Sequence, residues 1–222
     1  MVEGEKGVKE LLQSDFVVAT VVGTSGFIEA NQKLLKGGFE VIEASEKDLS
    51  AAGSFQTNQS ALAVARMQPN QAPSIKKTDW VVVLDDIRDP GNLGTIIRSA
   101  DWYGVKSIVA SPETADCYNP KVISASMGSF TRVSVFYTNL AEYLATHHDR
   151  VYGTFLKGEN LHDYKLHGGG FVVIGNEASG ISLEVEKLIT QRITIPRFGQ
   201  AESLNAAIAT AVLLDHAMRS KK

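Results

Sequence analysis

The second part of the chain alternates short, uninterrupted apolar runs with longer segments in which apolar residues recur every three to four positions. The apolar runs predict strands over residues 80–84, 107–110, 133–136, 150–155, 171–174 and 192–195. The intervening segments predict helices over residues 92–103, 119–127, 139–147, 182–190 and 203–219. Strands without polar alternation that are separated by helices indicate a mainly parallel sheet covered on both faces, so we expect an α/β fold.

A smaller α/β unit is predicted before residue 68. Its expected elements are a helix that ends over residues 8–12, a helix over 28–35, and strands over 16–22, 39–42 and 62–67. The following segment, QPNQAPS (68–74), has two prolines and no periodicity, which is typical of a linker. We therefore expect a small unit over 1–67, a linker over 68–78 and a larger α/β domain over 79–222.

Composition indicates the cellular compartment of the protein but leaves its binding partners open. The net charge is −3, with 8 Lys and Arg against 9 Asp and Glu up to residue 78 and 14 against 16 after it, so any nucleic-acid contact must come from a local patch or a dimer seam. The single cysteine, Cys117, excludes an intramolecular disulfide and a cysteine-based zinc cage, and we expect it to be a packing residue. The charged N-terminal segment lacks the apolar core of a signal peptide and no apolar run is long enough to span a membrane, so we expect a cytoplasmic protein without membrane contact.

Three loops that each follow an apolar strand contain unusual polar residues. The segment DDIRDPGN (85–92) follows the first strand of the larger domain, GNEASG (175–180) follows the strand over 171–174, and PRFGQAESLN (196–205) follows the strand over 192–195. Because the carboxyl ends of parallel strands meet at one edge of a sheet, we expect the three loops to form a single site.

Several common enzyme sites are excluded by their missing motifs. No G-x-G-x-x-G follows the first strand, no P-loop motif occurs anywhere, and the five histidines show no H-E-x-x-H spacing. Asp85 and Asp86 are neighbours on a strand, so their side chains point to opposite faces and do not easily chelate one ion. We therefore expect no metal.

The three segments DPGNLGTIIRSA, VVIGNEASGIS and IPRFGQAESLNAAIATAVLL closely resemble motifs 1, 2 and 3 of the SpoU (TrmH) family, in the same order. This family comprises RNA ribose 2′-O-methyltransferases of the SPOUT superfamily that depend on S-adenosyl-L-methionine (AdoMet). The segment YNPKVISASMG (118–128) also resembles the family's stretch between motifs 1 and 2, and the whole resemblance covers about residues 80–219. It implies a sheet with a C-terminal trefoil knot, a homodimer with motif 3 near the partner subunit, RNA as substrate and AdoMet as cofactor.

The first 67 residues resemble the ribosomal-protein-like RNA-binding domain that many members carry in front. Here VEGEKGVKELL resembles the first helix of that domain, entered late and without the usual basic segment. In the last helix, apolar residues form a face whose alanines permit close packing against a partner helix, which suits a dimer: Leu204, Ile208, Ala211, Val212 and Met218.

The resemblance implies five catalytic residues: Arg98, Asn92, Glu177, Ser203 and Asn205. Arg98 would handle the ribose 2′-hydroxyl. Because a guanidinium stays charged in proteins, binding the adjacent phosphate and polarising the hydroxyl is an easier role for it than that of general base. Glu177 would orient Arg98 or a substrate group, and the others would fix the geometry. Structural alternatives remain for four of them: a solvated Arg98 near its helix end, helix caps at Asn92 and Ser203, and a solvated loop acid at Glu177.

The resemblance also places four residues beside AdoMet, the last three chiefly through backbone groups: Thr154, Gly175, Ile195 and Leu204. One departure from the family is Ala178, which stands where glycine is usual, and whose methyl group would restrict a left-handed turn.

The expected reaction is methyl transfer from AdoMet to a ribose 2′-hydroxyl of structured RNA, with rRNA favoured over tRNA. Two other classes remain open: a non-catalytic RNA-binding protein that retains the methyltransferase fold, and an α/β enzyme that acts on a small molecule. The presence of all the polar motif residues argues against the first, and the ribosomal-protein-like front unit argues against the second.

Overall fold

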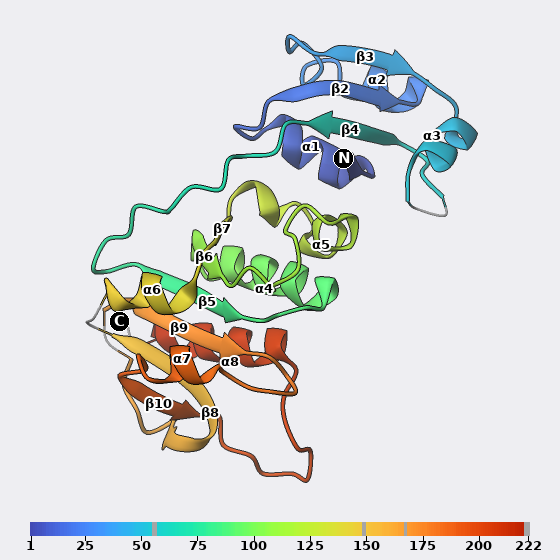
Figure 1. Ribbon diagram of the computed structural model, residues 1–222. Coiled ribbons are helices and arrows are strands. Elements are labelled where there is room, and N and C mark those ends of the chain that lie inside the picture. Colours follow the sequence, from blue (N-terminus) through green and yellow to red (C-terminus); the bar gives the residue numbers. More distant parts are fainter. Residues whose placement is uncertain (55–56, 148–149, 167, 220–222) are drawn as a thin grey trace.

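The computed structural model describes residues 1–54, 57–147, 150–166 and 168–219 (Figure 1). These residues form two sheets, a four-stranded one near the N-terminus and a six-stranded one from residue 80 onward. The N-terminal sheet lies at one end of the molecule, above the helices α4 and α5 in Figure 1, and a long extended segment leads from it to the larger sheet.

The larger sheet is parallel throughout its described strand pairs, in the order β10-β8-β9-β5-β6-β7. All six residues of β5 are buried, which explains why its sequence shows no polar alternation. This arrangement confirms the predicted α/β fold with a mainly parallel sheet. The strands are β5 (Trp80–Asp85), β6 (Ser107–Ala110), β7 (Ser134–Tyr137), β8 (Val151–Asn160), β9 (Gly170–Gly175) and β10 (Gln191–Thr194).

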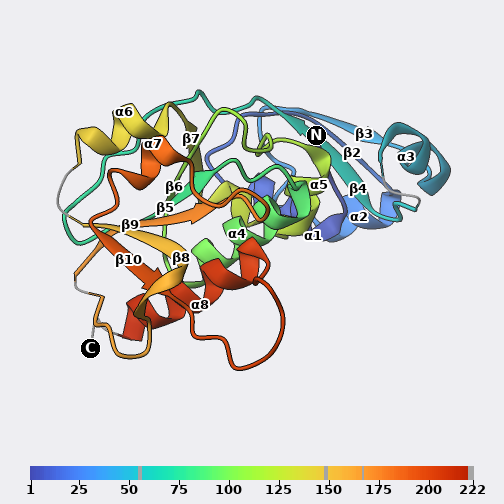
Figure 2. The same cartoon turned by 60° about the horizontal axis from the view of Figure 1, so that its bottom comes forward.

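Helices cover both faces of this sheet. Val82 and Leu84 of β5 belong to the core beneath α4 (Pro90–Trp102), α5 (Pro120–Ser126) and α8 (Ala206–Arg219). Val81 and Val83 point the other way, into a second core with α6 (Leu140–Ala145) and α7 (Leu183–Glu186). Figure 2 shows the resulting three layers, with α6 and α7 on one side of the sheet and α4 and α8 on the other.

The N-terminal sheet has the order β1-β4-β2-β3, in which β4 is antiparallel to both neighbours and β2 is parallel to β3. Its core contains Val8 and Leu11 of α1, packed against Val21 and Ala63 of the sheet. The elements in chain order are β1 (Val2–Glu3), α1 (Glu5–Leu12), β2 (Val18–Gly23), α2 (Ser25–Ala30), β3 (Glu40–Glu43), α3 (Glu46–Ala52) and β4 (Ala61–Ala65).

Several predicted helix limits are wrong. The helix expected over 28–35 is α2, which begins after the N-cap Thr24 and ends at Ala30. The sequence reading missed β1 and also α3, although α3 begins with a capping box between Ser45 and Asp48 that is a readable start signal. The helix expected over 182–190 is only the four-residue α7, and the strand expected over 150–155 continues to residue 160 in β8.

Cys117 is buried, and this burial raises the pKa of its thiol to about 11. The thiolate is therefore a minor species near neutral pH, in agreement with a packing role. Within the part of the chain that the structure describes, no helix is long and apolar enough to cross a membrane.

The contact between α4 and α5 requires a glycine at position 94. A Cβ atom there would lie 2.6 Å from the Ala125 Cβ and 2.7 Å from the Val122 carbonyl oxygen. We expect Gly94→Ala to lower the free energy of unfolding by roughly 1–3 kcal/mol, because α4 and α5 must move apart. Gly26→Ala in α2 is the matched control, since its added methyl meets nothing within 4 Å. Urea denaturation of both variants tests this; equal stabilities would show that the two helices separate at no cost.

Candidate functional site

The three loops meet at the carboxyl edge of the larger sheet. Glu177, from the loop after β9, accepts a hydrogen bond on Oε1 from the Asn92 side-chain amide (3.0 Å) and another from the Asn205 side-chain amide (3.1 Å). Asn205 also donates to the Asn92 side-chain oxygen at 2.7 Å. The predicted convergence is therefore present, and it consists of a closed triangle of side chains, one from each motif.

The two helices that begin at this edge run side by side. Asn92 and Asn205 pair at their N-terminal ends, and the Tyr103 hydroxyl donates to Asp215 at 3.4 Å farther along. Glu177 also accepts the backbone N–H of Ala206, the first residue of α8, at 3.2 Å. The carboxylate thus lies at the N-termini of two helices, where the helix dipoles favour a negative charge.

The cap of the last helix is Asn205, not Ser203. The Asn205 side-chain oxygen accepts the N–H groups of Ala207 (3.0 Å) and Ile208 (3.3 Å), and α8 begins at Ala206. The predicted helix start at 203 is therefore wrong. Ser203 is exposed in the loop before the helix and is not part of the triangle.

The loop after β9 is fixed by residues that the sequence reading did not single out. The Asn176 side chain donates to the Asp86 carbonyl oxygen (2.9 Å) and accepts the N–H groups of Ala178 (2.8 Å) and Ser179 (3.1 Å). Buried Asp85 accepts the N–H of Ser182 at 2.7 Å. Two features of the sequence could have identified these residues. Asn176 directly precedes the motif glutamate, and Asp85 is an acid at the end of an apolar strand.

Backbone strain and tight packing occur in the same two loops. Asp86 has a φ of 62°, in the left-handed region, and its carboxylate pairs with Arg88 at 2.6 Å. A Cβ at Gly175 would lie 2.3 Å from the Gly180 backbone, so the close approach of the loop to itself requires this glycine. Ala178 is not among the residues with positive φ; the left-handed position of this loop is Gly180, at 73°. The expected conflict at Ala178 is thus absent.

Arg98 stands apart from the triangle. It is exposed on α4, in one stripe with Thr95 and Trp102, and among the described residues its side chain has no hydrogen bond or ion pair. Glu177 binds the two asparagines and not Arg98, so of its two predicted roles, orienting Arg98 or a substrate group, only the second stays a prediction. The free guanidinium is available to an anionic or hydroxyl group of a ligand.

The four residues expected at the cofactor come from three neighbouring strands and one loop: Thr154 lies within β8, Gly175 ends β9, Ile195 follows β10, and Leu204 lies in the loop before α8. Pairing between β8 and β9 stops at Gly153 and Val173, so the two strands separate where Thr154 and Gly175 stand. The Thr154 hydroxyl donates to the Val173 carbonyl oxygen at 3.1 Å. Ile195 packs against the core, whereas Leu204 is 47% exposed. The printed pairs of these two strands therefore end beside two of the four expected residues, Thr154 and Gly175.

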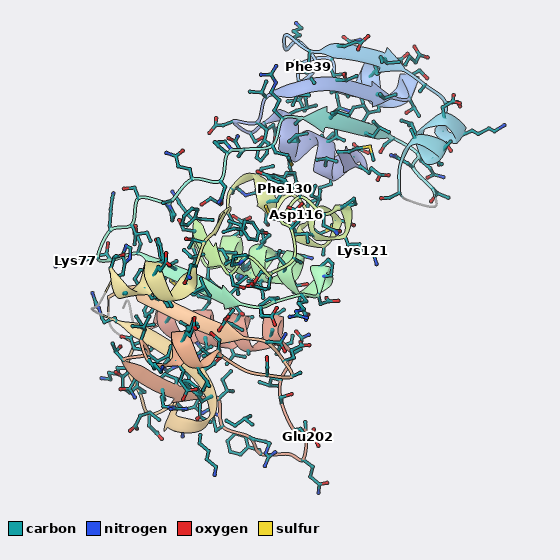
Figure 3. All side chains as sticks on the ribbon, in the orientation of Figure 1. Phe39, Lys77, Asp116, Lys121, Phe130 and Glu202 are labelled. Atoms are coloured by element: carbon teal, nitrogen blue, oxygen red, sulfur yellow. The ribbon has the colours of Figure 1, made fainter. Side chains whose placement is uncertain are left out.

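The loop between β10 and α8 extends away from the body of the molecule. Figure 3 labels Glu202 near its tip, at the lower right of that view. Its residues from Arg197 to Asn205 are exposed, and the Arg197 guanidinium donates to the Ala201 carbonyl oxygen at 3.2 Å across the loop. In the described residues no group of three or more His, Cys, Asp and Glu side chains could hold a metal ion.

Residues 79–215 match the model of the SpoU rRNA methylase family. The chain belongs to this family. It is 31% identical, over 97% of its length and 87% of the relative's, to the 23S rRNA (guanosine(2553)-2′-O)-methyltransferase RlmP of Bacillus subtilis.

Solved structures of SpoU-family members are similar over nearly the whole chain. A TrmH-family protein of Porphyromonas gingivalis matches 98% of this chain and 88% of its own, with a TM-score of 0.88 and 36% identity. The SpoU methyltransferase AviRb of Streptomyces viridochromogenes, solved in complex with AdoMet, matches 99% of this chain and 89% of its own, with a TM-score of 0.86 and 26% identity.

The correction at Ser203 leads to a direct test. We expect Asn205→Ala to lower the free energy of unfolding by about 1 kcal/mol, because it removes the helix cap. Ser203→Ala, two residues away, is expected to stay within about 0.5 kcal/mol of the parent protein, as exposed substitutions usually do. Chemical denaturation distinguishes the two, and a larger effect at Ser203 would restore the original cap assignment.

Proposed function

We propose that this protein transfers a methyl group from AdoMet to a ribose 2′-hydroxyl of structured rRNA. The observation that carries the proposal is the hydrogen-bonded triangle of Asn92, Glu177 and Asn205, which joins the three family motifs at one sheet edge. The activity named for RlmP, which aligns with almost the whole chain, makes 23S rRNA the first substrate to test.

The cofactor would be held where β8 separates from β9 and where β9 and β10 end. Thr154, Gly175, Ile195 and Leu204 would surround it, mainly with backbone groups, and the separation of β8 from β9 supports this placement. When bound there, AdoMet supplies a methyl group on a sulfonium that is already activated. The work of the protein is then to position the acceptor hydroxyl and to assist the loss of its proton.

Arg98 is the group that we assign to the RNA. Its guanidinium would bind the phosphate next to the target ribose and polarise the 2′-hydroxyl, which lowers the cost of the oxyanion that attacks the methyl group. Asn92, Glu177 and Asn205 would act as positioning residues, and Ser203 would contact the ligand from the exposed loop rather than cap the helix.

The same proposal includes the domain boundaries and the knot. We assign residues 1–67 to an RNA-binding unit of ribosomal-protein-like fold, 68–78 to the linker and 79–222 to the methyltransferase domain with a C-terminal trefoil knot. Two observations support the knot: β10 lies outside β8, and α8 then returns across the sheet to pack beside α4 and β9.

The outer face of α8 supports a homodimer. The buried face of this helix is formed by its small and apolar residues at 206, 207, 210, 213, 214 and 217. The other face carries Ile208, which is 52% exposed, and Leu204 in the loop directly before the helix is 47% exposed. On α4 beside it, Trp102 is 84% exposed. Exposed apolar groups on two adjacent helices are typical of an interface, and we propose that a second copy of the chain covers them.

Arg98→Ala tests the catalytic assignment. We expect methyl transfer from radiolabelled AdoMet to an unmodified 23S rRNA transcript to fall by about 100-fold or more, because the transition state loses its cation. AdoMet affinity, measured by calorimetric titration, should stay within about twofold, since Arg98 does not line the cofactor side. Lys187→Ala, which removes an exposed cation next to α7 on the opposite face of the sheet, serves as control.

Two outcomes of these assays would contradict the proposal. Full activity of Arg98→Ala would remove Arg98 from the mechanism. A parent protein that binds AdoMet and RNA but transfers no methyl group would be the non-catalytic RNA-binding alternative.

Ile208→Asp tests the dimer. A buried aspartate without a partner is costly, so we expect this variant to be monomeric in light scattering after size exclusion while the parent protein is a dimer. Leu183→Asp is the matched control, because Leu183 is equally apolar and 76% exposed but belongs to α7 on the other face of the sheet. A dimeric Ile208→Asp variant would place the interface elsewhere.

A further inference from the structure

Arg132 joins the N-terminal unit to the helix that carries Arg98. Its Nε donates to both oxygens of Asp101, at 3.2 and 3.0 Å, and another nitrogen lies 2.9 Å from Asp101 Oδ2. The remaining nitrogen of the guanidinium binds the Glu10 carboxylate. Asp101 belongs to α4, three residues after Arg98, whereas Glu10 belongs to α1 of the N-terminal unit. One side chain therefore bridges the two parts of the molecule.

The charges at this bridge make Arg132 necessary. Two carboxylates bind the same guanidinium, so without it Glu10 and Asp101 would face each other as like charges. The side chains are only partly exposed, at 46% for Arg132, 28% for Glu10 and 24% for Asp101, which reduces screening by water. Replacing the arginine would thus convert an attraction between the two units into a repulsion.

Close packing accompanies the ion pairs. Phe16 of the N-terminal unit contacts the ring edges of Tyr118 and Phe130, with centroid separations of 6.4 and 5.7 Å. A Cβ at Gly128 would lie 2.6 Å from the Glu10 side chain, so the helix α1 approaches this turn as closely as the backbone permits. We call this contact region around Arg132 and Phe16 the seam. Figure 3 labels Phe130 there, between the N-terminal sheet and the layer of α4 and α5.

The connecting segment is also attached. The Gln68 N–H donates to the Tyr118 hydroxyl at 3.0 Å. The Asn70 side chain pairs with both backbone groups of Tyr137, at 2.9 Å each, and so extends the edge of β7. Together with the Arg132 bridge and Phe16, these bonds restrict motion between the two units at three separate places.

We propose that Arg132 is a positioning residue for RNA, which fixes the N-terminal unit relative to Arg98 so that structured RNA binds both units as one surface. The inference rests on the proposed RNA methyltransferase function. Two binding surfaces held at the correct spacing gain affinity because the second contact is intramolecular and little freedom is lost on binding. A loose connection would lose that gain while each surface stayed intact.

The test is a series of affinities for an unmodified 23S rRNA transcript, measured by filter binding. We expect Arg132→Gln to weaken binding about five- to tenfold and Glu10→Gln about threefold, because each breaks the bridge. The double variant Glu10→Gln/Arg132→Gln should recover part of the loss, since it removes the like-charge repulsion. Lys9→Gln removes a cation of α1 whose one ion pair among the described residues is with Glu5 of the same helix, and it should change affinity less than about twofold.

Two outcomes of the RNA-affinity measurements would overturn the proposal. If Arg132 contacts RNA directly, Glu10→Gln leaves binding unchanged or strengthens it, because a negative charge is removed. If only the number of positive charges matters, Lys9→Gln weakens binding as much as Arg132→Gln does. AdoMet affinity should be the same in every variant, and a general loss of structure would lower it.

Small-angle X-ray scattering supplies a readout that needs neither RNA nor activity. The parent protein and Lys9→Gln should scatter as one rigid shape, and Arg132→Gln should have a larger radius of gyration. If the scattering of Arg132→Gln is unchanged, the Arg132 bridge does not fix the two units relative to each other, and the proposal is refuted. A parent protein that binds the transcript but transfers no methyl group would refute the proposed enzyme activity alone, and the affinity series would still decide the role of Arg132.

Discussion

The site depends on one carboxylate that accepts three hydrogen bonds. Glu177 Oε1 joins side chains that are 85 and 28 residues away in the sequence, and it also accepts the first backbone N–H of α8. Acids in exposed loops are usually solvated and mobile, and their ion pairs contribute little. This one is held because a free N–H group at the N-terminus of α8 and the side-chain amides of Asn92 and Asn205 all bind it, and the helix dipole favours a negative charge there.

That arrangement in turn depends on the parallel sheet. Parallel strands place the starts of their following helices at one edge, so Asn92 and Asn205 can be neighbours although the chain passes through five strands between them. The loop bearing Glu177 is then fixed from below by Asp85 and Asn176, which bind its backbone. The close approach of Gly175 to Gly180 leaves the loop no space for another path. The carboxylate is presented by a rigid support rather than by a flexible loop.

The sequence predicted β5, β6 and β9 well because each is an almost continuous apolar run. It predicted the helix ends poorly, because a cap is decided by which side chain reaches the free N–H groups. Ser203 and Asn205 are both good cap residues, and Asn205 is the one that caps the helix while its side-chain amide binds Glu177. The two-residue β1 has no periodicity to detect, and the partnership of Glu177 with two asparagines instead of Arg98 depends on distances that no spacing encodes.

In the proposed mechanism, Arg98 and the triangle have different parts. The triangle is made of bonds between protein side chains, so the protein orders it on folding, which is the condition for preorganised catalysis. Arg98 has no partner among the described residues, so its guanidinium gains its full interaction only when an anion or a developing oxyanion arrives. Interactions of that kind accelerate the chemical step only if the substrate is already oriented. The orientation must then come from contacts away from the reacting atoms, and the rigid seam around Arg132 is where this structure can provide it.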